Sequence, residues 1–451
     1  MYYEFQVKKL IDKMKREILF LFFSIGLLLA ACNPVRWSTD PVRPNQPGKP
    51  IPGKPAPMDT IRWTPNNTGK PPIGGVPGKP HPPSTGETYH LAFLLPFLSN
   101  QMTDGTVSDK SRLALQFYAG AKIALQQLSS ELDINLVADV WDTQATDADF
   151  QKLMANPQLE KASVFIGPIR SSHVQTFAEW TKKRHKILIS PESPTADLTT
   201  QNPDFLQINP SLRAHCEAIT RYIRKTNKPD AVTLVCKQKE ADRLPYFQNA
   251  IIGSSGSGRF AELVIPDETI NFDKVDLKKH LHVDRTSVFV LPSWASQDFV
   301  MAFLRKLKDI KGTNRIEVYG MPQWRNYDAI DPEYLSSLNV HISSASWFDY
   351  SAQDVKGFQQ KFYETTGTIP DEDGFNGYDV MMFTGRMLAS YGLSFPARIG
   401  TVTGNTLRGQ YAFSKIFSTS ALDDSHNTLD YWENTFVHIL KFDKFGFVPV
   451  E

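Results

Sequence analysis

From residue 89 onward, apolar residues follow a pattern that alternates between strand-like and helix-like segments. The run 91–97 is continuously apolar, which is typical of a strand buried on both faces. Residues 113–128 carry apolar side chains at spacings of three and four, which predicts a helix. The predicted elements that follow are strands at 135–141, 163–166 and 187–189 and helices at 147–154 and 174–183. This order predicts a doubly wound parallel sheet.

The same alternation restarts after residue 211, which predicts a second α/β unit. Its predicted helices are 212–225, 244–252 and 297–310, and its predicted strands are 231–236, 262–265, 287–291 and 316–319. The remaining predicted elements are a strand at 340–344, helices at 353–366 and 374–390, and an antiparallel, strand-like alternation at 434–450. Two similar units in one chain predict an α/β protein with two lobes and a cleft between them.

The N-terminus has the features of an export signal. Five Lys and Arg residues between 8 and 16 precede the apolar run 18–29, which is shorter than the roughly 20 residues of a membrane-spanning helix. The sequence Leu-Ala-Ala-Cys, which ends at Cys32, resembles a bacterial lipobox, in which the cysteine is acylated. A plain membrane anchor is the alternative. Asn33 resembles outer-membrane sorting, so we expect a lipid anchor in the outer membrane, with the protein facing the periplasm.

A Pro-, Gly- and Lys-rich segment at 32–87 follows the expected signal peptide, 1–31. Proline fixes φ and removes a hydrogen-bond donor, so this segment predicts neither helix nor sheet. We expect a disordered tether that holds the rest of the protein away from the membrane. At about 3.1 Å per residue in a polyproline II conformation, it could reach on the order of 170 Å.

The overall charge argues against nucleic-acid binding, and the two remaining cysteines raise the question of a disulfide. Lys and Arg number 49 and Asp and Glu number 48, so the chain lacks the basic excess typical of nucleic-acid-binding proteins. Cys216 and Cys236 fall on different predicted elements. An oxidising compartment would allow a disulfide, but nothing in the sequence brings the two together, which favours two buried thiols.

Three segments that could suggest an enzyme lack the required pattern. The glycine-rich segment 253–258 has neither the spacing of a nucleophile elbow nor the lysine of a phosphate-binding loop. His280 and His282 have no apparent third metal ligand. The acidic residues 371–373 precede a predicted helix and are expected to complement its dipole. We therefore expect no catalytic residue, no metal and no cofactor.

Two serines follow the predicted strand at 163–166. Ser171 and Ser172 come directly after Gly167-Pro168, where a helix is expected to begin. In open parallel sheets, ligands bind beyond the carboxyl ends of the strands, and the free N–H groups of a helix N-terminus attract anions such as a carboxylate. The alternative is that one serine simply caps the helix.

Several segments follow one another in a characteristic order and spacing: LAFLLPF, FYAGAKIAL, DVWDTQATD, ASVFIGP, ILISPESP, FLQINPS and GFNGYDV. Over residues 89–395, this order resembles the type I periplasmic binding proteins, the leucine/isoleucine/valine-binding group. The resemblance implies two Rossmann-like lobes, joined by three crossovers, that close on a small ligand. The implied lobes are 88–208 with 341–400, and 209–340 with 401–451.

The resemblance also implies roles for individual residues. Ser171 or Ser172 matches the serine that binds the ligand carboxylate in that family. The segment 189–194 matches a family segment that usually reads Ile-Ser-Pro-x-x-Thr, but Pro194 replaces the threonine that helps to hold an α-amino acid. Ser193, next to it, is a further candidate for ligand binding. The serine end of an amino-acid site is therefore expected to be present, and the other end to be damaged.

The second lobe contributes two tryptophans to the expected site. Trp294 and Trp324 each follow a predicted strand and are expected at the rim of the cleft, where they could stack on a ring or a sugar or pack a lid. The segment 237–243 lacks the tyrosine that is often found there in the family.

Two functions remain open at this point. The first is a receptor lipoprotein for a small polar or amino-acid-like ligand, which the serine pair and the tryptophans favour. The alternative is a non-catalytic regulator of a cell-wall (peptidoglycan) synthase with the same fold, which the long tether and Pro194 favour.

Overall fold

The computed structural model describes residues 58–63, 86–102, 108–252, 258–269, 272–294, 296–417, 429–444 and 446–450. The expected signal peptide, Cys32, nearly all of the expected tether and most of the glycine-rich segment lie outside these ranges. No helix within them combines the length and the apolar character that crossing a bilayer requires.

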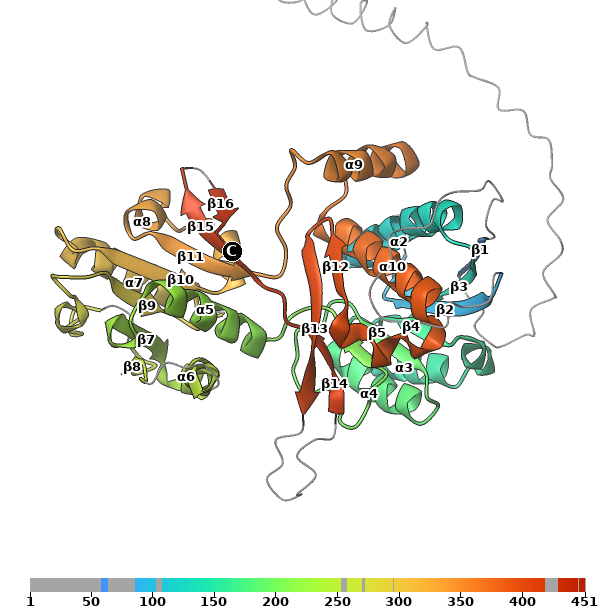
Figure 1. Cartoon of the computed structure of the whole chain (residues 1–451), viewed down its shortest axis with the longest axis horizontal. Coiled ribbons are helices and arrows are strands. Elements are labelled where there is room, and N and C mark those ends of the chain that lie inside the picture. The colour runs from blue at the N-terminus through green and yellow to red at the C-terminus, as the bar shows by residue number, and fades with distance from the viewer. Residues whose placement is uncertain are drawn as a thin grey trace, which may run out of the picture. The chain divides into compact units, whose positions relative to one another are not determined.

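The first lobe is built on a nine-stranded sheet with the order β1-β3-β2-β4-β5-β6-β14-β13-β12 (Figure 1). Six neighbouring strands of this sheet, from β3 to β14, run parallel, and β1, β13 and β12 extend it in antiparallel fashion. The strands are β1 (Asp59–Trp63), β2 (Thr88–Leu95), β3 (Asn135–Asp142), β4 (Val164–Ile166), β5 (Ile187–Ser190), β6 (Phe205–Gln207), β12 (Thr403–Thr406), β13 (Gly409–Phe417) and β14 (Leu429–Asn434).

Helices cover both faces of this sheet, and each face has its own apolar core. The helices α2 (Arg112–Glu131) and α10 (Glu372–Tyr391) lie on one face, and α3 (Asp147–Met154) and α4 (Ser171–Lys182) on the other (Figure 1). The helix α9 (Gln353–Thr366) packs outside α2 through Phe358 and Phe362.

Glycines allow α2 and α10 to approach closely. A Cβ atom at Gly120 would lie 1.9 Å from the carbonyl oxygen of Gly374, and one at Gly377 would lie 1.9 Å from that of Phe117. Because both obstacles are backbone atoms, no side-chain rearrangement could relieve the clash. The contact between the two helices therefore requires glycine at both positions.

The second lobe is built on a seven-stranded sheet with the order β16-β15-β11-β10-β9-β7-β8. Its strands are β7 (Val232–Lys237), β8 (Ala261–Ile265), β9 (Ser287–Val290), β10 (Ile316–Gly320), β11 (Val340–Ser344), β15 (His438–Asp443) and β16 (Gly446–Pro449). Its helices are α5 (Leu212–Thr226), α6 (Leu244–Ile252), α7 (Gln297–Ile310) and α8 (Pro332–Ser337). The chain passes between the two sheets three times, after β6, β11 and β14.

The strand pairing differs from the expected boundaries of the lobes. The strand β11 belongs to the second sheet, whereas β12, β13 and β14 belong to the first. The regions 341–400 and 401–451 are therefore not divided as expected. The physical reason is that β14 pairs with β6, where Trp432 lies opposite Leu206 and joins the core of the first lobe.

The expectation that the whole tether forms no sheet is also wrong. Five residues of it, Asp59–Trp63, form β1, which pairs with β3 and forms one edge of the sheet. This stretch contains no proline, so its N–H groups can join the ladder. The Thr60 hydroxyl donates a hydrogen bond to the Asp139 carboxylate, and the Tyr118 hydroxyl donates one to the Asp59 carboxylate.

The preference for two buried thiols is confirmed, since Cys216 and Cys236 are both free and buried.

Candidate functional site

The candidate site lies where β4 and β5 end, at the carboxyl edge of the first sheet. Gly167 directly follows β4, and its φ of +88° lies in the region that favours glycine. A Cβ atom there would also lie 2.2 Å from the carbonyl oxygen of Leu94. Glycine thus lets the chain turn tightly against β2 before α4 begins at Ser171.

Three hydroxyl groups meet at the start of α4. The oxygen Oγ of Ser171 lies 2.8 Å from Oγ of Ser193 and 3.0 Å from Oγ1 of Thr195. Ser193 is buried, with 2% of its surface exposed, whereas Thr195 is exposed. We call these three residues the hydroxyl cluster. Each oxygen can both donate and accept, so the cluster can turn its donors toward an anion.

The helix-capping alternative for the two serines is wrong. The N-cap residue of α4 is Arg170, and no side chain caps this helix by a hydrogen bond. The hydroxyl of Ser171 is directed to the cluster instead. Ser172 is exposed and is not part of the cluster, and its carbonyl accepts a hydrogen bond from Thr176.

Thr195 was not predicted from the sequence as a candidate for ligand binding. Pro194 removes a hydroxyl from the matched family segment, and Thr195 places one within reach of Ser171, one position later. The signal was present in the sequence as a threonine directly after the altered position. The end of the site that was expected to be damaged therefore still has a hydroxyl group close by.

The backbone at the start of α4 adds hydrogen-bond donors. The first bond within the helix runs from the N–H group of Val174 to the carbonyl of Arg170, so the three preceding N–H groups have no partner inside the helix. The helix dipole adds a partial positive charge at this end. Together with the hydroxyl cluster, these groups can bind a carboxylate or another small anion.

A carboxylate lies beside the hydroxyl cluster. Glu192 directly precedes Ser193, and its carboxylate accepts a hydrogen bond from Nδ2 of Asn376 on α10. Burial, and then the nearby charge of Asp373, raise the pKa of Glu192 to about 7. Burial, and then the charge of Asp371, raise the pKa of Asp373 to about 6. Both groups therefore titrate close to neutral pH.

The sequence and the structure were compared with those of known proteins. No protein-family model matches the sequence, and no curated protein matches it. Among solved structures, a branched-chain amino acid ABC transporter protein from Rhodospirillum rubrum is similar with a TM-score of 0.57 at 14% identity, over 80% of this chain and 100% of that one. A substrate-binding protein from Desulfitobacterium hafniense in complex with Leu is similar with a TM-score of 0.50 at 14% identity, over 81% and 100%. A periplasmic ligand-binding protein from Burkholderia xenovorans LB400 is similar with a TM-score of 0.53 at 11% identity, over 80% and 94%.

The chain has the type I periplasmic binding fold. This confirms the resemblance in fold that the order of the sequence segments indicated. The carboxyl ends of the second lobe's strands are followed by the two tryptophans that the sequence singled out, Trp294 and Trp324.

The two tryptophans of the second lobe differ in their surroundings. Trp324 is 2% exposed, belongs to the apolar core, and donates from Nε1 to the carbonyl of Ser293 over 3.3 Å. This placement favours packing over stacking on a ligand. Trp294 is partly exposed, and its ring meets that of His215 edge to face at 5.9 Å between centroids.

The segment 237–243 of the second lobe, which lacks the expected tyrosine, holds an ion pair between the buried Glu240 and the partly exposed Arg243. Glu240 accepts from Arg243 at 3.0 Å and from the Ser293 hydroxyl at 2.6 Å. Arg243 also donates to the carbonyl of Pro292 at 2.7 Å. These bonds connect the residues after β7 to those after β9. They make this edge of the second lobe polar.

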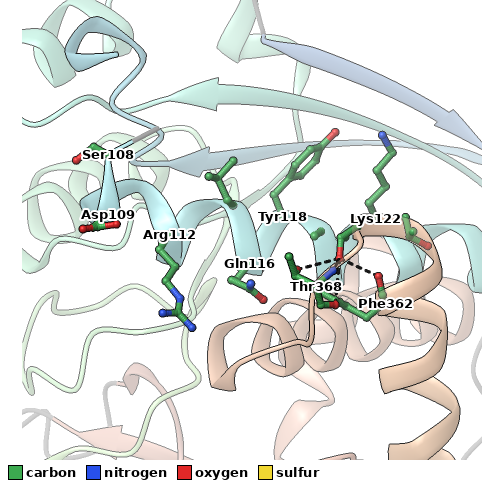
Figure 2. Close-up of a pocket in the computed structure, with 12 residues that line it drawn as sticks. Ser108, Asp109, Arg112, Gln116, Tyr118, Lys122, Phe362 and Thr368 are labelled. Atoms are coloured by element: carbon green, nitrogen blue, oxygen red, sulfur yellow. Dashed lines mark hydrogen bonds between the residues drawn. The ribbon is translucent and has the colours of Figure 1, made fainter. Parts of the chain in front are cut away.

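A separate groove runs along α2, away from the hydroxyl cluster (Figure 2). Its volume is about 550 Å³, and its walls come from α2 and the end of α9. Figure 2 shows Tyr118 and Lys122 pointing to one side of α2 and Arg112 and Gln116 to the other. Leu115, 41% exposed, adds an apolar surface to the groove. The sequence pattern gave no sign of this groove.

Proposed function

We propose that the protein is a lipid-anchored receptor of the cell envelope that binds a small polar, amino-acid-like ligand between its two lobes. The observation that carries this proposal is the meeting of three hydroxyl groups at the open N-terminus of α4. A ligand carboxylate there would accept hydrogen bonds from the hydroxyl cluster and from the backbone N–H groups of α4. Binding involves no chemical step, so the proposal includes no catalytic residue.

The similar structures favour an amino acid as the ligand. Two of them are named for branched-chain amino acid transport, and the protein from Desulfitobacterium hafniense was solved with Leu. In our proposal, Ser171, Ser193 and Thr195 hold the carboxylate, while Trp294 offers the second lobe's apolar contact. Ser172 would contribute only its backbone N–H group, and Trp324 would support Trp294 from the core.

The anchor is part of the proposal. We infer that the signal peptide, 1–31, is removed and that Cys32 carries the lipid, in the outer membrane and facing the periplasm. Because β1 begins at Asp59, we infer that the linker between Cys32 and the first lobe comprises about 25 residues, 33–57. At about 3.1 Å per residue this linker could reach about 80 Å, roughly half of the value for the whole expected tether.

A thermal-shift screen tests the receptor function. The chain from residue 32 onward, with Cys32→Ser to keep it soluble, would be screened against amino acids, short peptides and muropeptide fragments. A ligand at 100 times its Kd should stabilise the protein by about 2.7 kcal/mol. Stabilisation by one class of small ligand supports the proposal. If no compound of a broad screen changes the melting temperature, the receptor function is rejected.

The alternative function, regulation of a cell-wall synthase, is favoured by the groove along α2, which offers a protein partner an apolar surface with charged margins. Leu115→Asp would disrupt such a surface without touching the hydroxyl cluster. Recovery of a peptidoglycan synthase with the native chain, and its loss with Leu115→Asp, would favour this function. The same variant should leave ligand binding unchanged if the receptor function holds.

A further inference from the structure

Carboxylates outnumber cationic groups around Glu192, the residue directly before Ser193. Five carboxylates interact here with three guanidinium groups: Glu192, Asp371, Glu372, Asp373 and Asp379 with Arg112, Arg325 and Arg408. Each guanidinium group already has a carboxylate of its own. Two negative charges therefore remain without a dedicated cation.

The existing ion pairs show which two carboxylates remain. Arg112 pairs with Asp371 at 3.0 Å and Arg325 with Glu372 at 3.3 Å. Arg408 lies 3.8 Å from Asp379 and also donates to the Tyr411 hydroxyl. Among the described residues, no cationic side chain lies within 4 Å of the carboxylates of Glu192 and Asp373.

An unsatisfied acceptor lies at the same place. Asn376 is 1% exposed, and its Nδ2 donates to Glu192, but its Oδ1 has no hydrogen-bond partner among the described residues. A buried amide oxygen without a donor costs free energy. A group that carries several N–H donors and a positive charge would satisfy this oxygen and both unpaired carboxylates at once.

We propose that Glu192, Asp373 and Asn376 form a subsite for a cationic group, and that the ligand therefore carries a net positive charge. This inference rests on the proposed receptor function, because the hydroxyl cluster would hold the carboxylate of the same molecule. An ordinary α-amino acid brings one ammonium and one carboxylate and leaves two protein carboxylates uncompensated. A basic amino acid, with a guanidinium or a second ammonium group, matches the subsite.

Calorimetric titration with matched probes tests the inference. L-Arginine and L-citrulline have nearly the same shape, but the guanidinium of one is a neutral ureido group in the other. A hydrogen bond to a charged group is worth enough to change affinity by about tenfold to a hundredfold. We expect the native chain to bind arginine at least tenfold more tightly than citrulline. Equal affinities, or a preference for citrulline or leucine, would overturn the inference and leave the receptor function intact.

Two variants test whether the preference for arginine over citrulline depends on the subsite. Glu192→Gln keeps the shape of the side chain and an acceptor for Asn376, and should remove most of the preference for arginine over citrulline. The control is Glu364→Gln, the same charge change at an exposed position on α9. If the control lowers the preference as much as Glu192→Gln does, the effect is general electrostatics and the subsite is rejected. If no amino acid binds to any form of the chain, the receptor function itself fails.

The pH dependence gives an independent readout. The raised pKa values, about 7 for Glu192 and about 6 for Asp373, mean that both groups take up protons as the pH falls from 8 to 5. A cationic ligand favours their ionised forms, so arginine affinity should fall about tenfold or more over this range, with protons released on binding near pH 6. Citrulline affinity should change little. An arginine affinity that is flat across this range would contradict the subsite.

Discussion

The interactions of single side chains decide how the candidate site is interpreted. Pro194 alone suggests a site that has lost one end, but Thr195 places a hydroxyl 3.0 Å from Ser171. The location of the site was predictable, because the carboxyl ends of parallel strands meet at one edge of a sheet. The partnership between Glu192 and Asn376 was not, because these residues lie 184 positions apart and only the fold brings them together.

Replacing Ser171 with alanine should weaken ligand binding much more than it weakens the fold. The change removes the hydroxyl that contacts both Ser193 and Thr195, so affinity for a carboxylate ligand should fall about tenfold to a hundredfold. Because Ser171 does not cap α4, the free energy of unfolding should fall by less than about 1 kcal/mol. The control is Ser172→Ala, which removes an exposed hydroxyl outside the cluster. Equal affinities of the two variants for a confirmed ligand would refute a role for the cluster.

His215 should make the second lobe sensitive to acid. Burial lowers the pKa of His215 to about 3, so the native state holds it neutral while the unfolded chain takes up a proton below about pH 6.5. The free energy of unfolding should therefore be unaffected by this group above pH 6.5 and fall as the pH decreases below it. By pH 5 the loss should be about 2 kcal/mol.

His215→Phe should remove this loss. Urea unfolding at pH 7.5 and pH 5.0 would measure it as a smaller decrease in the variant than in the native chain. His90→Phe, a change at an exposed histidine of β2, is the control and should keep the full decrease. An unchanged decrease in His215→Phe would show that this histidine is not held neutral.

At the level of helices and strands, the apolar pattern predicted most elements of the two sheets but missed β6, β12 and β13. The helix α6 and the strand β11 match their predicted bounds. The strand β12 was missed because its residues, Thr403–Thr406, are polar or glycine and none of them is buried. The assignment of β14 to the wrong lobe has another cause: the predicted alternation began only at residue 434, and a strand pattern does not show which sheet a strand joins. Its partner, β6, is a three-residue strand far away in the sequence.

The contact between α2 and α10 gives a prediction about these elements. Gly120→Ala would place a methyl group 1.9 Å from a backbone oxygen of α10, so the two helices would have to separate. Overpacking typically costs about 1–3 kcal/mol, and we expect at least the upper end because the obstacle is backbone. Gly357→Ala on α9 is the matched control, since nothing lies within 4 Å of its Cβ position. This control should be neutral or stabilising by up to about 1 kcal/mol. Equal unfolding free energies for the two variants would contradict the close packing.

At the scale of the whole molecule, the sequence indicated the fold but not how the N-terminal part of the chain attaches to it. The order of the segments indicated the type I fold, since three passages of the chain between two sheets follow from that order. The attachment of the chain's N-terminal part was not predicted, because the five residues of β1 lie within a proline-rich stretch. Since β1 runs antiparallel to β3, Asp59 lies opposite Val140, near the end of β3. The linker therefore joins the first lobe at the edge of the sheet that carries the hydroxyl cluster.

The proposed lipid anchor at Cys32 can be tested by replacing this cysteine. Cys32→Ser should abolish acylation, so the variant should leave the membrane fraction, while mass spectrometry of the native chain should show a lipid on Cys32. A single acyl chain binds a bilayer only weakly, so stable fractionation with membranes requires the several chains of a bacterial lipoprotein. Ligand affinity should not change in Cys32→Ser, because the hydroxyl cluster belongs to the folded first lobe and not to the linker. If the variant still sediments with membranes and the native chain carries no lipid, the region before Cys32 acts as a plain membrane anchor instead.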